Sequence, residues 1–336
     1  MPFLPDFSCC GRLRAALMTS HPYSDDPCES VTRARHATVF GNQQAGGGKA
    51  AKLLYECKEI FRKCGISADI QITSSLDDLE ARALKAVENG AQLLFAVGGD
   101  GTLQGLVNVA FGHDVVLGVV PAGGGNDFAR ALGLPRDPVE ALLAALQGQP
   151  RKVDLARARF GDGRQRLFLG GGGIGLDAAT AKFSSGHFRN WPGRARYIAS
   201  AICAYTGYRP RRVRITIDSE GSIPWQDCVL ASVLNTPSFG AGIRPAPDAR
   251  INDGLLDFVF LDELSIGRLL FALPQLALQG TLNLPHLRIL RFRKMRIETE
   301  TPAYFHGDGE LLGPTPVEVE AVPNAVKFLA PKPKAS

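Results

Sequence analysis

Cysteine is scarce in this chain of 336 residues, and long apolar runs are missing. The seven cysteines are odd in number and form no CxxC or Cys/His spacing, which argues against a disulfide framework and against a zinc site. This usage favours a reducing, cytoplasmic environment. The most apolar late segment, residues 269–284, is short for a membrane span and contains Pro274 and Gln275. We therefore expect no segment that crosses a bilayer.

The net charge of +5 is too small to indicate a nucleic-acid partner, but the positive charge is unevenly distributed. Residues 182–214 contain eight lysines and arginines and no aspartate or glutamate, with Trp191 and three tyrosines between them. A second basic cluster covers residues 288–296. The first stretch is either a surface that docks on an anionic membrane or an ordinary solvated surface.

In the first half of the chain, short apolar runs alternate with segments of helical periodicity. The runs predict strands at residues 37–42, 68–75, 91–99 and, with a glycine loop, 115–127. Helices are predicted at residues 49–65, 76–90, 102–111 and 137–148. Strands that alternate with helices in this way predict a doubly wound parallel sheet, whose ligands bind outside the carboxyl ends of the strands.

Beyond Val153 the helical segments become sparse, and the pattern is typical of an antiparallel sheet or sandwich. Strand-like runs occur at residues 211–221, 225–236, 254–263, 287–300 and 315–330. Two predicted helices, at residues 194–205 and 266–278, interrupt them. With 336 residues, the chain is long enough for two domains of these different kinds.

Three predicted strands are followed by glycine-rich loops, at residues 41–50, 98–102 and 121–130. In a parallel sheet, all three loops lie at the same edge. Glycines allow backbone N–H groups to turn toward a phosphate, and the helix that follows adds a partial positive charge. Lys49 is a further candidate for a phosphate contact. Each loop by itself could equally be a strand-to-helix turn, but together they predict an anion-binding site.

Two of these loops also contain a carboxylate, Asp100 and Asp127. A carboxylate beside phosphate-binding amides is repulsive unless a metal ion lies between them. We therefore interpret Asp100 as a residue that organises Mg²⁺ and water around the phosphates of a nucleotide. For Asp127, a metal role and an N-cap of the following helix are equally compatible with the local pattern.

Four motifs in order, "FAVGGDGTLQGLVN", "LGVVPAGGGNDFARALGLP", "APDARINDGLLDFVF" and "FHGDGELL", resemble those of the diacylglycerol kinase catalytic-domain family. That family includes bacterial soluble lipid kinases and the sphingosine and ceramide kinases. The resemblance extends from about Ala37 to Ala330. It implies an α/β nucleotide domain like those of phosphofructokinase and NAD kinase, and a β-sandwich-like lipid domain. The implied divisions are a flexible extension (1–35), a nucleotide domain (36–154), a lipid-substrate domain (155–312), and a C-terminal return to the first domain with a tail (313–336).

The resemblance also implies roles for individual residues. Glu310 matches the proposed general base, and Asp100 and Asp127 would join a magnesium and water network. A structural Mg²⁺ site would use Asp253 and the backbone carbonyls of Arg250 and Leu255, although "NDG" alone is a turn signal. The residues expected to bind ATP are Asn42, Gln43, Gln44, Ala45, Gly46, Lys49, Thr73, Gly98, Gly99, Asp100, Gly101, Thr102, Leu103, Gln104, Gly124 and Asn126.

Three positions depart from the family pattern. Gln43 replaces a proline, Gly124 replaces the threonine of the PAGTxND loop, and Gly105 replaces the glutamate of GGDGTxxE. The lost threonine removes a hydroxyl that typically helps to hold the nucleotide, so weaker or slightly different ATP binding is expected. Activity is expected to survive, because Asp100, Asp127 and Glu310 all remain.

These observations together predict a lipid kinase that transfers the γ-phosphate of Mg·ATP to a lipid hydroxyl. Diacylglycerol, phosphatidylglycerol, ceramide and a sphingoid base all remain open as acceptors. The alternatives are an NAD kinase-like enzyme for a small molecule and an inactive regulator that binds a nucleotide or lipid. We expect a cytoplasmic protein that associates transiently with a membrane surface, and a homodimer is one option for its assembly.

Overall fold

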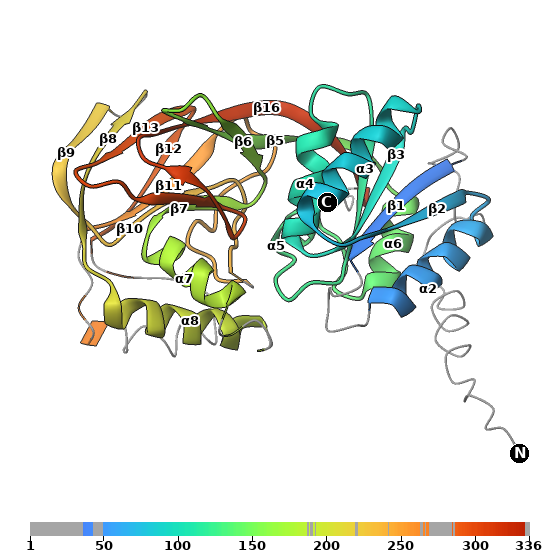
Figure 1. Ribbon diagram of the computed structural model, residues 1–336, viewed down its shortest axis with the longest axis horizontal. Helices are drawn as coiled ribbons and strands as arrows, with labels where there is room; N and C mark the ends of the chain where they lie inside the picture. Colours follow the sequence, from blue (N-terminus) through green and yellow to red (C-terminus); the bar gives the residue numbers. More distant parts are fainter. Residues whose placement is uncertain are drawn as a thin grey trace, which may run out of the picture.

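One long strand, β16 (Val317–Ala330), joins two lobes into a single molecule (Figure 1). The computed structural model describes residues 36–42, 50–186, 188, 191, 193–218, 221–240, 242–262, 265, 267–268, 284 and 286–332. The first lobe contains strands β1 to β4 and helices α2 to α6. The second lobe contains the other strands and helices α7 and α8.

The first lobe is built on four parallel strands in the order β2-β1-β3-β4. Their bounds are β1 (His36–Asn42), β2 (Ser67–Thr73), β3 (Leu93–Gly98) and β4 (Val116–Pro121). Every residue of β3 is buried, as its continuous apolar sequence requires between two layers of helices. The helices are α2 (Ala50–Lys63), α3 (Leu76–Glu88), α4 (Asp100–Ala110), α5 (Asp127–Ala131) and α6 (Pro138–Leu146).

Local sequence signals fix where two of these helices begin. Ser75 caps α3 by accepting a hydrogen bond from the amide of Asp78, and Asp137 caps α6 by accepting from Val139 and Glu140. Helix α3 packs beside α4, and α2 lies beside α6. The carboxyl ends of β3 and β4 therefore carry their glycine loops toward the second lobe (Figure 1).

The second lobe contains two sheets that enclose a core of aromatic and branched side chains. One sheet is antiparallel, in the order β12-β11-β10-β7-β14-β15. Its strands are β7 (Gly171–Gly175), β10 (Leu230–Leu234), β11 (Leu256–Leu261), β12 (Leu287–Phe292), β14 (Tyr304–Gly307) and β15 (Glu310–Pro314). The other uses β5 (Gln149–Phe160), β6 (Gln165–Phe168), β8 (Arg211–Ile217), β9 (Gly221–Cys228), β13 (Lys294–Thr299) and β16. Helices α7 (Leu176–Ser185) and α8 (Gly193–Gly207) lie along one side of this lobe (Figure 1).

Strand β16 belongs to both lobes. Its first half pairs with β13, its last residues pair in parallel with β4, and β5 runs antiparallel beside almost its whole length. Accordingly, Val317 and Val319 are buried in the core of the second lobe, whereas Phe328 is buried in that of the first. The ten-stranded sheet is thus continuous between the lobes.

The predicted fold class is confirmed: a parallel-dominated α/β lobe is followed by an antiparallel β lobe. Strand β5 runs through the expected boundary at residue 154, and β7 and α7 were not anticipated. The predicted helix at residues 266–278 lies almost entirely outside the described residues, as do the extension 1–35 and the loop 43–49. Within the described ranges, none of the helices combines the length and hydropathy needed to cross a bilayer.

We predict that the end of β16 is essential for the stability of the first lobe. Phe328 is fully buried, and its ring lies 5.0 Å from that of Phe128 between centroids. Phe328→Ala should lower the free energy of unfolding by about 3–5 kcal/mol in urea titrations, because a buried aromatic side chain is replaced by a cavity. Tyr304→Ala is the control, because that ring is 61% exposed and its loss should change stability by less than about 0.5 kcal/mol. Equal effects of the two variants would contradict the packing of β16 in the first lobe.

Candidate active site

A cleft of about 270 Å³ lies where the glycine loops of the first lobe meet the second lobe. Three predicted catalytic residues, Asp100, Asp127 and Glu310, line it together. Its other lining residues are Gly99, Gly101, Gly124, Gly125, Gly170, Ala181, Arg196, Tyr197, Phe239, Gly240, Asp308 and Gly309. The loops after β3 and β4 are therefore adjacent, as parallel strand ends predict, and the β14–β15 hairpin faces them.

The two glycine loops touch through their backbones. A Cβ atom placed on Gly123 would lie 2.6 Å from the Cα atom of Gly99, closer than any real side chain can approach. The loop after β4 is also closed on itself, because the Asn126 side chain accepts from the amide of Gly123 and donates to its carbonyl. Glycine at position 123 is therefore required for packing as well as for the predicted anion-binding loop.

Asp100 is the residue that connects these loops. Its carboxylate accepts hydrogen bonds from the amides of Asp127 and Phe128, at 3.3 Å each, and so stabilises the start of α5. Burial, together with the negative charges of Asp127 and Asp308, raises the pKa of Asp100 to about 7, although the two amide hydrogen bonds oppose this shift. Its ionised form is therefore disfavoured in the cleft, and a bound cation would stabilise that form.

The carboxylate of Asp127 is directed to the second lobe. Its Oδ1 atom accepts from the hydroxyl of Ser238 at 2.7 Å and from the amide of Gly242 at 2.9 Å, and it forms an ion pair with Arg130. The alternative N-cap role is not seen, because Asn126 precedes the helix and Asp127 is its first residue. Through these hydrogen bonds, Asp127 connects the glycine loop after β4 to the second lobe.

Glu310 is exposed at the start of β15, and Asp308 fixes the turn that presents it. The Asp308 carboxylate accepts from the amides of Leu169 and Gly170 at 2.8 Å and of Gly171 at 3.2 Å. Burial raises the pKa of Asp308, which these hydrogen bonds oppose. The "HGDGE" pattern correctly indicated a hairpin turn, but it gave no sign that the turn is held to another strand.

Helix α4 contributes to the cleft indirectly. Gln104, an expected nucleotide contact, is buried and donates to the carbonyl of Gly307, which supports the hairpin that carries Glu310. At Gly105, a Cβ atom would lie 2.7 Å from methyl groups of Leu76 and Leu79. A glutamate at position 105 would therefore require the side chains of Leu76 and Leu79 to shift.

The space beside Gly124, where a side chain would lie, is occupied by a residue of the second lobe. A Cβ atom on Gly124 would lie 3.3 Å from Nη2 of Arg196, which belongs to α8. The Nε atom of Arg196 is buried and has no hydrogen-bond partner in the described part of the chain. A guanidinium group with an unused donor thus points at the glycine loop. The basic stretch 182–214 was noted in the sequence, but nothing there singled out Arg196.

The other expected ATP contacts occupy different places. Asn42 and Thr73 are register partners at the ends of β1 and β2, and Thr73 is buried. The Thr102 side chain fills the space beside Gly98, and Leu103 belongs to the core. Gln43, Gln44, Ala45, Gly46 and Lys49 lie outside the described residues.

The expected metal site around Asp253 has a simple turn geometry. Asp253 is exposed, and its Oδ1 atom accepts from the amide of Leu255 within the same turn that follows Arg250. In the described part of the chain, no three His, Cys, Asp or Glu side chains are grouped closely enough to hold a metal ion by themselves. A cation here would depend on a single carboxylate and on backbone carbonyls, so the site remains a prediction.

A buried polar group behind the cleft was missed in the sequence. Asp177, at the start of α7, accepts from the hydroxyl of Ser232 and lies 3.3 Å from Nε2 of the fully buried His306. Phe239 packs on His306, and Tyr197 packs on Phe239. Burial raises the pKa of Tyr197 well above its ordinary value, so its hydroxyl stays neutral. The far wall of the cleft is therefore aromatic, with a polar group beneath it.

Comparisons with known proteins agree with this geometry. Residues 36–158 match the family model of the diacylglycerol kinase catalytic domain, and residues 172–330 match that of the YegS C-terminal NAD kinase beta sandwich-like domain. The chain is 29% identical over 297 residues to "Diacylglycerol kinase" of Mycobacterium tuberculosis (strain ATCC 25618 / H37Rv), which covers 88% of this chain and 95% of that protein.

Two further relatives extend the likeness. The chain is 32% identical over 221 residues to "Probable lipid kinase YegS-like" of Chromohalobacter salexigens, which covers 64% of this chain and 68% of that protein. The crystal structure of a diacylglycerol kinase from Bacillus anthracis str. Sterne has the same fold, with a TM-score of 0.67 at 21% identity, over 90% of this chain and 99% of that one.

The raised pKa of Asp100 predicts a pH-dependent penalty in the absence of ligands. Between the ordinary value of 3.8 and about 7, the folded state binds the proton that the unfolded chain has released, so stability falls as pH rises through this window. Above pH 7 the penalty is complete at roughly 4 kcal/mol. Asp100→Asn removes it, so urea titrations from pH 4 to pH 8 should show the variant gaining stability relative to the unmodified protein. The control is Glu88→Gln, an exposed carboxylate on α3. A difference between Asp100→Asn and the unmodified protein that stays constant with pH would contradict the raised pKa.

Proposed function

The chain belongs to the diacylglycerol kinase catalytic-domain family of lipid kinases, and on this premise we propose that it transfers the γ-phosphate of ATP to the hydroxyl of a diacylglycerol-like lipid. One observation supports this proposal above the others: Asp100, Asp127 and Glu310, which are far apart in the sequence, line one cleft between an α/β lobe and a β-sandwich lobe. Glycine loops on one side suit phosphates, and the aromatic wall on the other suits a lipid headgroup.

Glu310 is the candidate general base. It is the exposed carboxylate of the cleft, held on a turn that Asp308 anchors through three amides. In the proposed reaction it accepts the proton of the lipid hydroxyl as the oxygen attacks the γ-phosphorus atom and ADP leaves. The rigid hairpin would align the hydroxyl, because phosphoryl transfer depends mainly on positioning and charge neutralisation.

The carboxylates of the cleft fit a divalent cation. The pKa of Asp100 is raised partly by Asp127 and Asp308, so the site holds negative charge that Mg²⁺ would offset. Mg²⁺ commonly uses one or two protein carboxylates together with substrate phosphates and water. Asp100 is the best placed ligand, with Asp127 beside it, and the ion when bound would neutralise charge on the phosphates.

Arg196 would supply a cation where the family has a threonine hydroxyl. Its guanidinium approaches Gly124 from α8, and its Nε donor has no partner among the described residues. Arginine forms charge-assisted hydrogen bonds with phosphate. We therefore propose that Arg196 contacts the nucleotide phosphates and that glycine at position 124 leaves room for it.

The lipid acceptor requires access from a membrane surface, and we propose that the α8 side of the second lobe faces it. Trp191, just before α8, is 51% exposed. Part of the basic stretch is already neutralised, because Arg212 pairs with Glu300 and Arg214 with Glu298. Docking would then depend on Trp191 and on the basic residues before β8.

The function is tested by transfer of labelled γ-phosphate from Mg·ATP to diacylglycerol, phosphatidylglycerol, ceramide and a sphingoid base in mixed micelles. Diacylglycerol should be labelled, and Glu310→Gln and Asp100→Asn should each lower kcat at least 100-fold. Glu88→Gln should leave the rate unchanged. Labelling of NAD but of no lipid would favour the small-molecule kinase, and ATP binding without any labelled product would favour an inactive binding protein.

The role of Arg196 predicts a specific rescue. Arg196→Ala should lower kcat/KM for ATP by about 10- to 100-fold, because the loss of one hydrogen bond to a charged group has an effect of this size. Gly124 is not in the left-handed region, so a threonine fits the backbone there. In the Arg196→Ala background, Gly124→Thr should restore part of the lost kcat/KM, because it returns a donor to the same place. A change in Arg196→Ala confined to the KM of the lipid would contradict the assignment.

A further inference from the structure

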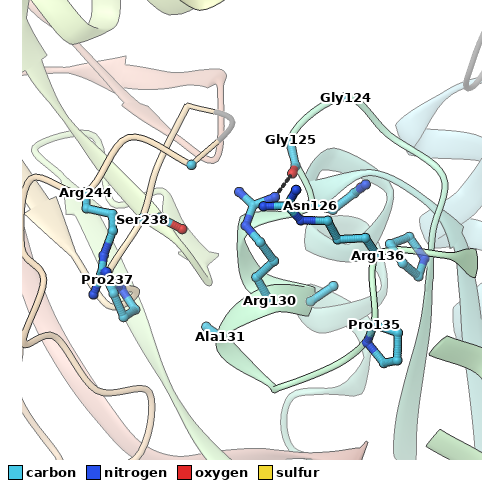
Figure 2. Close-up of a pocket in the computed structure, with 13 residues that line it drawn as sticks. Gly124, Gly125, Asn126, Arg130, Ala131, Pro135, Arg136, Pro237, Ser238 and Arg244 are labelled. Atoms are coloured by element: carbon cyan, nitrogen blue, oxygen red, sulfur yellow. Dashed lines mark hydrogen bonds between the residues drawn. The ribbon is translucent and has the colours of Figure 1, made fainter. Parts of the chain in front are cut away.

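A second, larger cavity of about 640 Å³ lies on the other side of the glycine loop, again between the two lobes. Figure 2 shows Arg130 and Arg136 on one wall, and Arg244 and Ser238 on the opposite wall. We call it the arginine cavity. It shares Gly124 and Gly125 with the cleft, but its lining includes neither Asp100 nor Glu310. It is therefore a separate space, of the size that binds small organic ligands.

The charge of the arginine cavity is opposite to that of the cleft. Four carboxylates line the cleft, whereas the described residues that line the arginine cavity include three arginines and no aspartate or glutamate. Arg130 is already neutralised, because it pairs with Asp127 and donates to the carbonyl of Gly125 at 2.6 Å. Arg130 therefore adds no uncompensated charge to the cavity.

The two other arginines differ from Arg130 in their contacts. Among the residues that the structure describes, neither Arg136 nor Arg244 forms an ion pair, and the one hydrogen bond of the Arg244 side chain goes to the carbonyl of Pro247 at 3.4 Å. Asp137, next to Arg136, is occupied with capping α6. Two guanidinium groups that form no ion pair with any described residue thus line one cavity from opposite lobes, Arg136 before α6 and Arg244 between β10 and β11.

We propose that the arginine cavity binds a phosphomonoester, which bridges the two lobes through Arg136 and Arg244. A phosphomonoester carries a charge of about −1.5 to −2 at neutral pH, which matches two arginines. Guanidinium groups also recognise phosphate oxygens in pairs. The remaining lining consists mainly of proline, alanine and glycine, so an organic group of modest size fits beside the phosphate.

Two kinds of ligand could supply the phosphomonoester group that the two arginines would bind. One is a soluble phosphomonoester, and the other is the headgroup of a lipid phosphomonoester, such as the product of the proposed kinase reaction. Because binding is measured without turnover, the proposal can be tested even if the proposed lipid kinase activity fails.

The test is calorimetric titration with glycerol 3-phosphate, together with sedimentation on phosphatidylcholine vesicles with and without phosphatidic acid. The variants are Arg136→Gln, Arg244→Gln and the double variant, with Arg164→Gln as the control. Arg164 is exposed in the β5–β6 turn and pairs with Asp162. Thermal unfolding verifies that each variant is folded, which is expected because no ion pair of the described residues is broken at positions 136 and 244.

The proposal predicts that the double variant loses at least tenfold in affinity for the phosphomonoester, that each single variant loses less, and that Arg164→Gln loses nothing. A saturating non-hydrolysable ATP analogue with Mg²⁺ should not displace the ligand. Binding of glycerol 3-phosphate identifies a soluble source, and binding only to vesicles with phosphatidic acid identifies a headgroup. Affinity that is unchanged in the double variant, displacement by the nucleotide analogue, or binding of neither probe would overturn the proposal.

Discussion

The relative position of the two lobes depends on strand β16. A hinge made of loops would let the lobes move apart, but here a hydrogen-bonded strand passes from one hydrophobic core to the other. At the crossing, the register with β5 shifts between Val322 and Val326, and Asn324 adopts a left-handed conformation. The buried carboxylate of Asp154 accepts from the amides of Asn324 and Gly254, so the irregular backbone remains satisfied. Strand β16 therefore fixes the relative position of the two lobes on one side of the cleft.

On the other side, the lobes are joined through charged side chains. Asp127 holds Ser238 and Gly242 of the second lobe, and Asp100 holds the start of α5. These contacts bring carboxylates together in a partly buried place, which is unfavourable for folding and typical of a functional site. The glycine loop between them separates an acidic space from a basic one. The same few residues thus arrange both the cleft and the arginine cavity.

Much of the first lobe could be predicted from the sequence, because its signals are local. The apolar run of β3, the Ser75 and Asp137 caps and the glycines at strand ends each act over a few residues. Strand β7 was missed because its sequence GGGIG has poor strand propensity. The structure supplies the reason for those glycines: a Cβ atom on Gly172 would lie 2.4 Å from the carbonyl oxygen of His306 on the neighbouring strand. Such a constraint comes from tertiary packing.

The sequence predicts which carboxylates belong to the site, but it does not predict the hydrogen bonds that hold them in place. Asp100, Asp127 and Glu310 stand in recognisable motifs, and they do meet in one cleft. The partners of Asp127 in the second lobe lie more than 100 positions away along the chain, and those of Asp308 more than 130 positions away. No periodicity or spacing reports contacts of that range, and the family motifs list residues without their hydrogen bonds.

Two of the three departures from the family pattern, Gly105 and Gly124, fit the packing between elements that are distant in the sequence. Gly105 lacks the glutamate of the motif, and the space that a side chain would need is filled by Leu76 and Leu79 of α3. The neighbouring Gln104 instead reaches the backbone of Gly307 and supports the hairpin of Glu310. Gly124 lacks the threonine, and Arg196 approaches from the opposite lobe. At both positions, side chains from other elements occupy the space next to the glycine. The effect of either glycine therefore depends on residues that are distant from it in the sequence, and not only on the strand-loop unit that contains it.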